Sequence, residues 1–198
     1  MTRGADPSQS LDFSCACGGL KGHLTPKGLK QGTHVTCFCP DCRANELYHH
    51  QPDPAPNPVD LFQMAAPEIV ITQGAEHLAL MRLSPKGLMR WYASCCGTPM
   101  FNTMATPALG FAAIRGDRVS DPARLGPVRG RGFVPQPGGG KAKHDGMRAV
   151  LGGILSRLIR TRLSGSWKRT VFFDAEGKPA AEAKLLSKEE RAALYPSG

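Results

Sequence analysis

The sequence predicts a mainly β protein, α+β overall, with a basic and helical C-terminal extension. Three observations indicate this class. The 198 residues include 23 glycines and 17 prolines, which favours a chain with many turns. Short segments rich in β-branched and aromatic residues follow one another up to about residue 115. Beyond residue 146, apolar residues recur at helical spacing.

Short strands are expected throughout the first part of the chain. In order, the extended segments are Leu11–Cys17, His34–Cys37, Val59–Met64, Glu68–Thr72, His77–Leu83 and Leu88–Ser94. Arg43–His50 suits one or two helical turns, and the proline-rich Gln51–Pro58 suits a loop. Pro85 and Gly87 take the second and fourth positions of a turn between the last two strands. These two strands are therefore predicted to form an antiparallel hairpin.

The C-terminal part is expected to hold two helices. Residues 1–115 are predicted to form a core. Residues 116–146, rich in Gly, Pro and Arg, are predicted to be a mobile connection. Residues 147–198 are predicted to form an extension that packs on or beside the core. Met147–Leu163 carries an apolar stripe at helical spacing, which is expected to face the core. Gly152 and Gly153 weaken this helix by about 1 kcal/mol each. Ser187 and Glu190 form a capping box that begins the last helix.

The net charge of +9 is concentrated in one segment. Residues 115–170 hold thirteen Lys or Arg against three Asp or Glu, a net of +10, whereas residues 1–114 are neutral with eight of each sign. Such a segment could bind nucleic acid or another anionic surface, with Met147–Leu163 as the apolar face on a membrane. It could also be a solvated loop followed by a packed helix. No aromatic residue lies among the arginines between Arg115 and Arg131. This argues against binding of single-stranded nucleic acid through stacking of bases on aromatic rings.

The sequence also indicates a compartment. It contains no apolar run of the roughly 20 residues that span a bilayer. The N-terminal Met1–Ser10 is polar and lacks the apolar centre of a signal peptide. A cytoplasmic location is therefore expected. In that reducing setting clustered cysteines favour a bound metal over disulfides.

Seven cysteines in three clusters carry the chemistry of the sequence: Cys15 with Cys17, then Cys37 with Cys39 and Cys42, then Cys95 with Cys96. Zinc is the expected metal, with four ligands in structural sites and three where one position stays open. Residues 37–42 could form such an open three-thiolate site. The same residues could instead share one structural zinc with another cluster, or act as a redox dithiol.

The last cysteine pair is harder to place. On an extended strand Cys95 and Cys96 would point to opposite faces, so only one would reach a metal. Gly97 allows a tight turn that could bring the second sulfur round. His49 and His50 could also supply a metal ligand or a general base. More commonly, two such histidines lie in a solvent-exposed loop and have no functional role.

The order and spacing of these motifs resemble a known family. Cys15-Ala16-Cys17-Gly18, Cys37-Phe38-Cys39-Pro40-Asp41-Cys42-Arg43 and the segment from Arg90 to Cys96-Gly97 appear in the order of the glutathione-dependent formaldehyde-activating enzyme family, which is related to the centromere-protein-V-like proteins. That family has the patterns C-x-C-G, C-x-C-x-x-C-[RK] and R-x-F-C-x-x-C-G. The resemblance covers roughly residues 11–115.

The resemblance implies a fold, a ligand set and an activity. It implies an antiparallel zinc β-tent holding one or two zinc ions, with a basic, helical extension after it. Cys15, Cys17 and Cys96 would hold a structural zinc, and Cys37, Cys39 and Cys42 the zinc of the active site. The implied activity is carbon–sulfur lyase chemistry on a glutathione or other thiol–aldehyde adduct. Arg90 could then bind a carboxylate of a glutathione-like ligand, or simply be a surface charge beside two aromatic residues.

One departure affects the fourth structural ligand. Ala93 stands where the family has the first cysteine of its last motif, and Cys95 is extra. Either Cys95 substitutes through a local change of backbone, or a histidine or water completes the site, or the site stays empty. A zinc enzyme is thus the first hypothesis, and a non-catalytic zinc-stabilised module that binds through residues 115–170 is the alternative.

Overall fold

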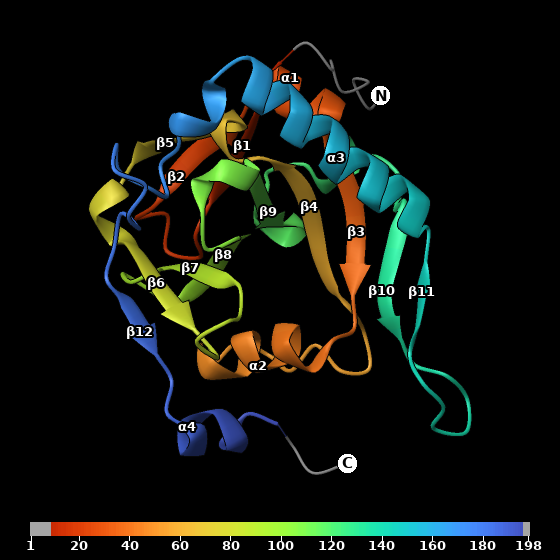
Figure 1. Ribbon diagram of the computed structural model, residues 1–198. Coiled ribbons are helices and arrows are strands. Elements are labelled where there is room, and N and C mark those ends of the chain that lie inside the picture. The colour runs from red at the N-terminus through yellow and green to blue at the C-terminus, as the bar shows by residue number, and fades with distance from the viewer. Residues whose placement is uncertain (1–8, 196–198) are drawn as a thin grey trace, which may run out of the picture.

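A computed structural model describes residues 9–195 of the chain (Figure 1). Most of the polar segment Met1–Ser10 therefore lies outside the described residues. The protein is mainly β, with two sheets and a few helices, so the predicted class is confirmed. In the described part of the chain, no helix is both long and apolar enough to cross a membrane.

The smaller sheet has three antiparallel strands in the order β1-β2-β5. Their bounds are Leu11–Ser14 for β1, Lys21–Leu24 for β2 and Ile69–Gln73 for β5. Gly22 allows the strands to approach closely, because a Cβ atom there would lie 2.0 Å from the Val70 carbonyl oxygen. This sheet ends beside the first cysteine cluster, which follows β1 directly.

The larger sheet has nine strands in the order β11-β10-β3-β4-β9-β8-β7-β6-β12. Their bounds in chain order are β3 Thr33–Cys37, β4 Val59–Ala65, β6 Leu78–Arg82, β7 Met89–Ala93, β8 Thr98–Thr103, β9 Phe111–Arg115, β10 Gly130–Val134, β11 Lys143–Asp145 and β12 Ala183–Leu185. Pairing is antiparallel except for β10 on β3 and β12 on β6, which are parallel. The predicted hairpin is present as β6 and β7.

The main core draws residues from both sheets and contains a cluster of aromatic rings. Trp91 packs against Phe172 with ring centroids 5.2 Å apart, and Phe101 contacts both Phe13 and Phe172 at 5.3 Å. Phe172 is fully buried although it comes from the C-terminal extension. Burying one such ring contributes roughly 1.5–3 kcal/mol. The extension is therefore part of the folded core.

The described residues contain four α-helices: α1 Pro26–Gln31, α2 Pro40–Tyr48, α3 Met147–Leu163 and α4 Lys188–Ala193. Helix α3 contacts β3, β4, β9 and β10, and α2 lies at the opposite end of β3 in Figure 1. The predicted capping box of α4 is present, with Ser187 and Glu190 each accepting a hydrogen bond from the other residue's backbone. Helix α2 begins three residues earlier than predicted, because Pro40 suits the first turn and Cys39 caps it.

The face that α3 buries differs from the expected one. Val150, Arg157 and Thr161 are buried against the sheet, whereas Leu151 and Leu155 are each 57% exposed. Arg157 donates hydrogen bonds to the Gln31 carbonyl and the Thr33 hydroxyl, at the end of α1 and the start of β3. These hydrogen bonds turn the face that carries Arg157 toward the sheet. The expectation that the whole apolar stripe faces the core was wrong for this reason.

The segment 116–146 is more ordered than the connection expected from its composition. It contributes β10, which pairs in parallel with β3, and β11, which pairs antiparallel with β10. Gly146 begins α3 with φ +67 and lies against the Arg129 carbonyl, where a Cβ atom would be only 2.0 Å away. The segment thus extends the large sheet and carries the chain onto α3.

Candidate metal centres

The structure gathers all seven cysteines into two clusters. The four-cysteine cluster consists of Cys15, Cys17, Cys95 and Cys96, and the three-cysteine cluster of Cys37, Cys39 and Cys42. Within each cluster the sulfur atoms lie within 4.8 Å of one another. No histidine of the described residues belongs to either cluster. Both groups could therefore hold a metal ion through thiolates alone.

Four of the six sulfur separations in the four-cysteine cluster are close to those of a tetrahedral site. Cys15 Sγ lies 3.6 Å from Cys17 Sγ and 3.8 Å from Cys95 Sγ, and the Cys17 and Cys95 sulfurs are 3.4 Å apart. Cys96 Sγ is 3.9 Å from Cys95 Sγ. Four sulfurs at about 2.3 Å from a tetrahedral ion stand about 3.8 Å from one another. The cluster has the dimensions of such a site.

A tight turn brings the second sulfur of the last cysteine pair into the cluster. The amides of Cys96 and Gly97 both donate to the Ala93 carbonyl, and Gly97 has φ +68. Because β7 ends at Ala93, the pair lies in a turn and not on an extended strand. The Cys95 sulfur therefore lies in one cluster with those of Cys15, Cys17 and Cys96. The Leu20 amide also donates to Cys15 Sγ at 3.2 Å, a contact that stabilises thiolates in metal sites.

The three-cysteine cluster lies where β3 ends and α2 begins. Cys37 is the last residue of β3, and Cys39 is the N-cap of α2. The Cys39 sulfur accepts the Cys42 amide at 3.3 Å. Pro40 provides the fixed φ of the first helical turn, which folds Cys42 back toward the other two sulfurs. The positive end of α2 favours negative charge at Cys39.

The three sulfurs hold their charge unequally. Hydrogen bonds from the Cys37 and Cys42 side chains lower the pKa of the Cys39 thiol, and the nearby Arg90 guanidinium acts in the same direction. Hydrogen bonding with the other two thiols, together with burial, raises the pKa of Cys42 well above its ordinary value. Negative charge is therefore favoured at Cys39, and a bound divalent cation would favour ionisation of all three thiols.

A cavity of about 390 Å³ opens beside the three-cysteine cluster. Its lining includes the three cysteines, Arg90 and Asn102. Arg90 is only 3% exposed and donates to the Asn102 side chain at 3.4 Å. The interpretation of Arg90 as a surface charge was therefore wrong. A buried guanidinium at the edge of a cavity is placed to meet an anionic group of a ligand.

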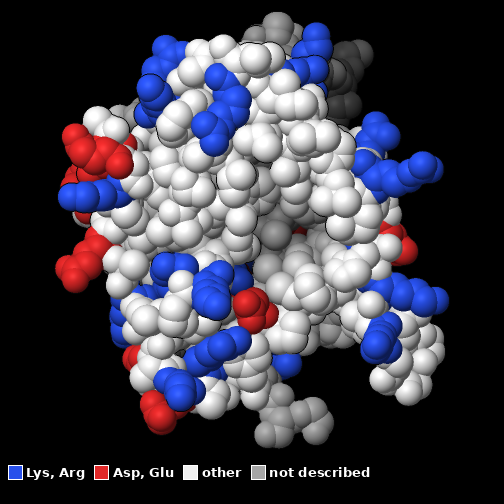
Figure 2. All heavy atoms as spheres, viewed as in Figure 1, with Lys and Arg blue, Asp and Glu red and all other residues white. Residues whose placement is uncertain are grey.

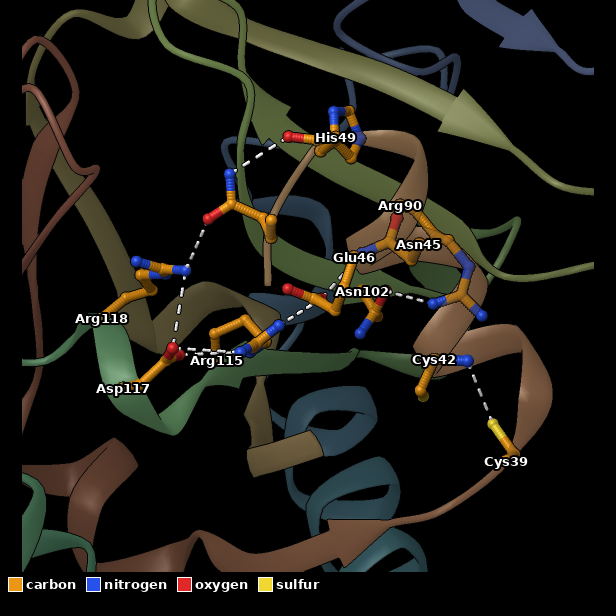
Figure 3. A network of polar contacts seen from close by, with 11 residues as sticks. Cys39, Cys42, Asn45, Glu46, His49, Arg90, Asn102, Arg115, Asp117 and Arg118 are labelled. Carbon is orange, nitrogen blue, oxygen red and sulfur yellow. Dashed lines mark hydrogen bonds and ion pairs between the residues drawn. The ribbon is translucent and has the colours of Figure 1, made fainter. Parts of the chain in front are cut away.

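A largely buried polar network connects α2 to the end of β9 and the residues after it (Figure 3). Arg115 forms ion pairs with Glu46 of α2 and with Asp117, and Asp117 lies 3.5 Å from Arg118. Glu46 and Arg115 are largely buried, at 3% and 11% exposure of their side chains. This network fixes α2 to the end of β9. The Glu46–Arg115 ion pair could not be predicted from the sequence, because no motif around Glu46 indicates a buried partner so distant in the chain.

His49 is buried and not a solvated loop residue. Its ring packs at a tilt against that of Tyr92, with centroids 4.3 Å apart, and burial lowers the pKa of its imidazole to about 4. Its Nε2 atom has no hydrogen-bond partner among the described residues. His49 therefore remains neutral at ordinary pH and packs α2 against β7.

Several arginines of the basic segment, residues 115–170, form hydrogen bonds or ion pairs with other parts of the chain. Arg115 and Arg118 belong to the buried network, Arg157 bonds to the α1–β3 connection, and Arg124 donates to the Ser10 carbonyl. On the face in Figure 2, Lys and Arg stand in separate groups around a mainly uncharged centre. The segment's net charge therefore overstates the number of cations available to a partner on this face.

Comparison with known proteins identifies a family but no function. Residues 7–184 match the profile of a family of unknown function, DUF6151. No curated protein matches the chain. A crystal structure of a Rhodobacter sphaeroides protein, a structural genomics target, is 17% identical with a TM-score of 0.42, over 61% of this chain and 98% of that one. At this level the resemblance does not bear on function.

Proposed function

Because the chain belongs to a family of unknown function, DUF6151, its role rests on its own geometry, and we propose a zinc protein that acts on thiol–aldehyde adducts. The four-cysteine cluster would hold a structural zinc, and the three-cysteine cluster a zinc with one open position. The convergence of three sulfurs at the edge of a cavity supports this proposal most directly. The fold would then be a zinc β-tent, as the motif resemblance implies.

Zinc suits both clusters because of the donor atoms. Thiolates are soft ligands that select zinc, copper(I) or iron–sulfur clusters, and zinc favours tetrahedral sets of four in structural sites. The four-cysteine cluster provides four sulfurs, and four of their six separations lie between 3.4 and 3.9 Å, which supports a tetrahedral zinc. The three-cysteine cluster provides three, so a fourth ligand would have to come from water or a substrate.

The proposed reaction is the cleavage of a carbon–sulfur bond in a thiohemiacetal. The hydroxyl of the adduct loses its proton, the carbonyl forms, the carbon–sulfur bond breaks, and both electrons of that bond leave with the sulfur as a thiolate. A zinc ion with an open position would supply the Lewis acidity that stabilises this thiolate. Asp41 and His144, which both line the cavity, are the candidate proton acceptors. Arg90 adds positive charge at the same end.

The test is thiol binding and adduct cleavage by the purified protein. Glutathione and its formaldehyde adduct are the first compounds to try. The variant with Cys37, Cys39 and Cys42 replaced by serine should lose both activities, whereas Cys95→Ser, in the other cluster, should retain thiol binding despite lower stability. Binding that survives the triple replacement would rule the proposal out.

A further inference from the structure

The cavity beside the three-cysteine cluster has mostly apolar walls, and this is the basis of an inference about its ligand. The wall residues come from distant parts of the chain: Val35, Leu61, Phe111, Phe133, Met147 and Val150. Figure 2 shows a hollow near the centre of the face that β3, β4 and α2 occupy in Figure 1, with uncharged atoms around most of its rim. A ligand in this cavity would bury an apolar body.

The outer wall is built by the part of the chain beyond residue 115. Phe133 lies on β10 with φ +59, a conformation that costs an aromatic residue free energy. Its ring packs edge-on against His144 of β11, with centroids 4.7 Å apart, and it remains 45% exposed. Strain of this kind persists where the surroundings hold it and is found at ligand sites. The strained backbone therefore keeps an apolar ring at the cavity wall.

The polar residues that line the cavity include two cations, Arg90 and Arg131, of which Arg90 is buried and Arg131 is exposed. Arg90 is loosely paired, at 3.4 Å from Asn102 and 4.0 Å from Asp41, although it is almost fully buried. The positive charge of Arg90 favours the ionised forms of the Cys39 and Cys42 thiols. Gln63 Oε1 is buried without a hydrogen-bond partner among the described residues, and Gln63 also lines the cavity. Figure 3 shows the Arg90 guanidinium directed toward Asn102 near Cys42.

From this arrangement we infer that the ligand is an apolar thiol with a single carboxylate close to its sulfur, bound free or as its aldehyde adduct. This inference rests on the proposed function. The sulfur would take the open position at the three-cysteine cluster, the carboxylate would pair with Arg90, and the apolar group would lie along Phe133, Met147 and Val150. Glutathione has no large apolar group and would leave these apolar walls without a partner.

The experiment uses the cobalt(II) form of the full chain and the thiolate-to-cobalt absorption bands. Four probes are titrated: 2-mercapto-3-phenylpropanoate, which has both features, 2-phenylethanethiol, mercaptoacetate and glutathione. The first should bind at least about tenfold more tightly than each of the others. Equal affinities, or tighter binding of glutathione, would overturn the inference and leave the proposed function standing. Bands that no thiol perturbs would overturn both.

Two variants separate the apolar wall from the carboxylate partner. Phe133→Gly relieves the positive φ and removes the ring, so it should fold and bind 2-mercapto-3-phenylpropanoate about tenfold more weakly, with mercaptoacetate unchanged. Leu151→Ala, an exposed apolar residue outside the cavity, is the matched control and should change neither. Arg90→Gln should abolish the preference for 2-mercapto-3-phenylpropanoate over 2-phenylethanethiol. Unchanged binding of 2-mercapto-3-phenylpropanoate in Phe133→Gly would contradict the inference, whether or not Arg90→Gln folds.

Discussion

At the scale of single residues, Gly19 limits the size of the four-cysteine cluster. A Cβ atom at Gly19 would lie 3.0 Å from Cys95 Sγ and 3.4 Å from Cys17 Sγ. Gly19→Ala should therefore separate two sulfurs, reduce zinc retention, and lower the free energy of unfolding by about 2 kcal/mol. Zinc content and urea denaturation measure these effects.

Gly152→Ala is the matched control, because a Cβ atom at this helical glycine meets no neighbouring atom within 4 Å. It should keep its zinc and gain up to about 1 kcal/mol of stability. If Gly19→Ala keeps its zinc and its stability as well, the sulfurs are not packed as described.

His49 makes stability depend on pH. Burial lowers the pKa of its imidazole from 6.5 to about 4, so the unfolded chain takes up a proton that the folded chain does not. The resulting stability is present above pH 6.5 and is lost as the pH falls toward 4, by about 3 kcal/mol in total.

Replacing His49 with Gln should flatten this part of the stability profile. The measurement is the free energy of unfolding of both proteins at several pH values between 4 and 7. Because thiol protonation affects both proteins alike, the difference between them isolates His49. If the free energy of unfolding depends on pH in the same way in both proteins, His49 is not buried in its neutral form.

At the scale of elements, Arg157 joins α3 to the connection between α1 and β3. This residue is only 3% exposed, and its burial lowers the pKa of the guanidinium to about 10. Arg157→Met should leave the Gln31 carbonyl and the Thr33 hydroxyl without this donor and cost about 2–3 kcal/mol. Arg160→Met, at an exposed position of the same helix, should stay within about 0.5 kcal/mol of the parent. Equal effects in urea denaturation would contradict this assignment.

Sequence patterns identified some elements and missed others for physical reasons. The turn at Pro85 and Gly87 and the capping box at Ser187 are local signals, so the hairpin and α4 could be predicted. Strand β10 could not, because Gly130 and Gly132 interrupt its pattern and its partner β3 is distant in sequence. The buried face of α3 was missed since it is chosen by polar partners on other elements and not by hydrophobicity.

At the scale of the whole molecule, the candidate site combines predictable and unpredictable parts. The spacing of Cys37, Cys39 and Cys42 was enough to group these residues, because a strand end and a helix start bring them together. The place of Cys95 depended on the turn after Ala93, which only the folded chain defines. The cavity wall depended on a parallel pairing that brings residues 130–150 against the cysteines.

The central claim is that each cluster holds one zinc ion, and zinc-edge X-ray absorption with metal analysis tests it most directly. Seven sulfurs shared by two ions give about 3.5 per zinc, with a lighter atom as the remaining ligand of the three-cysteine site. Replacing Cys37, Cys39 and Cys42 with serine should leave one zinc per chain, bound by four sulfurs. A chain purified without zinc, or a triple variant that still holds two ions, would contradict the account.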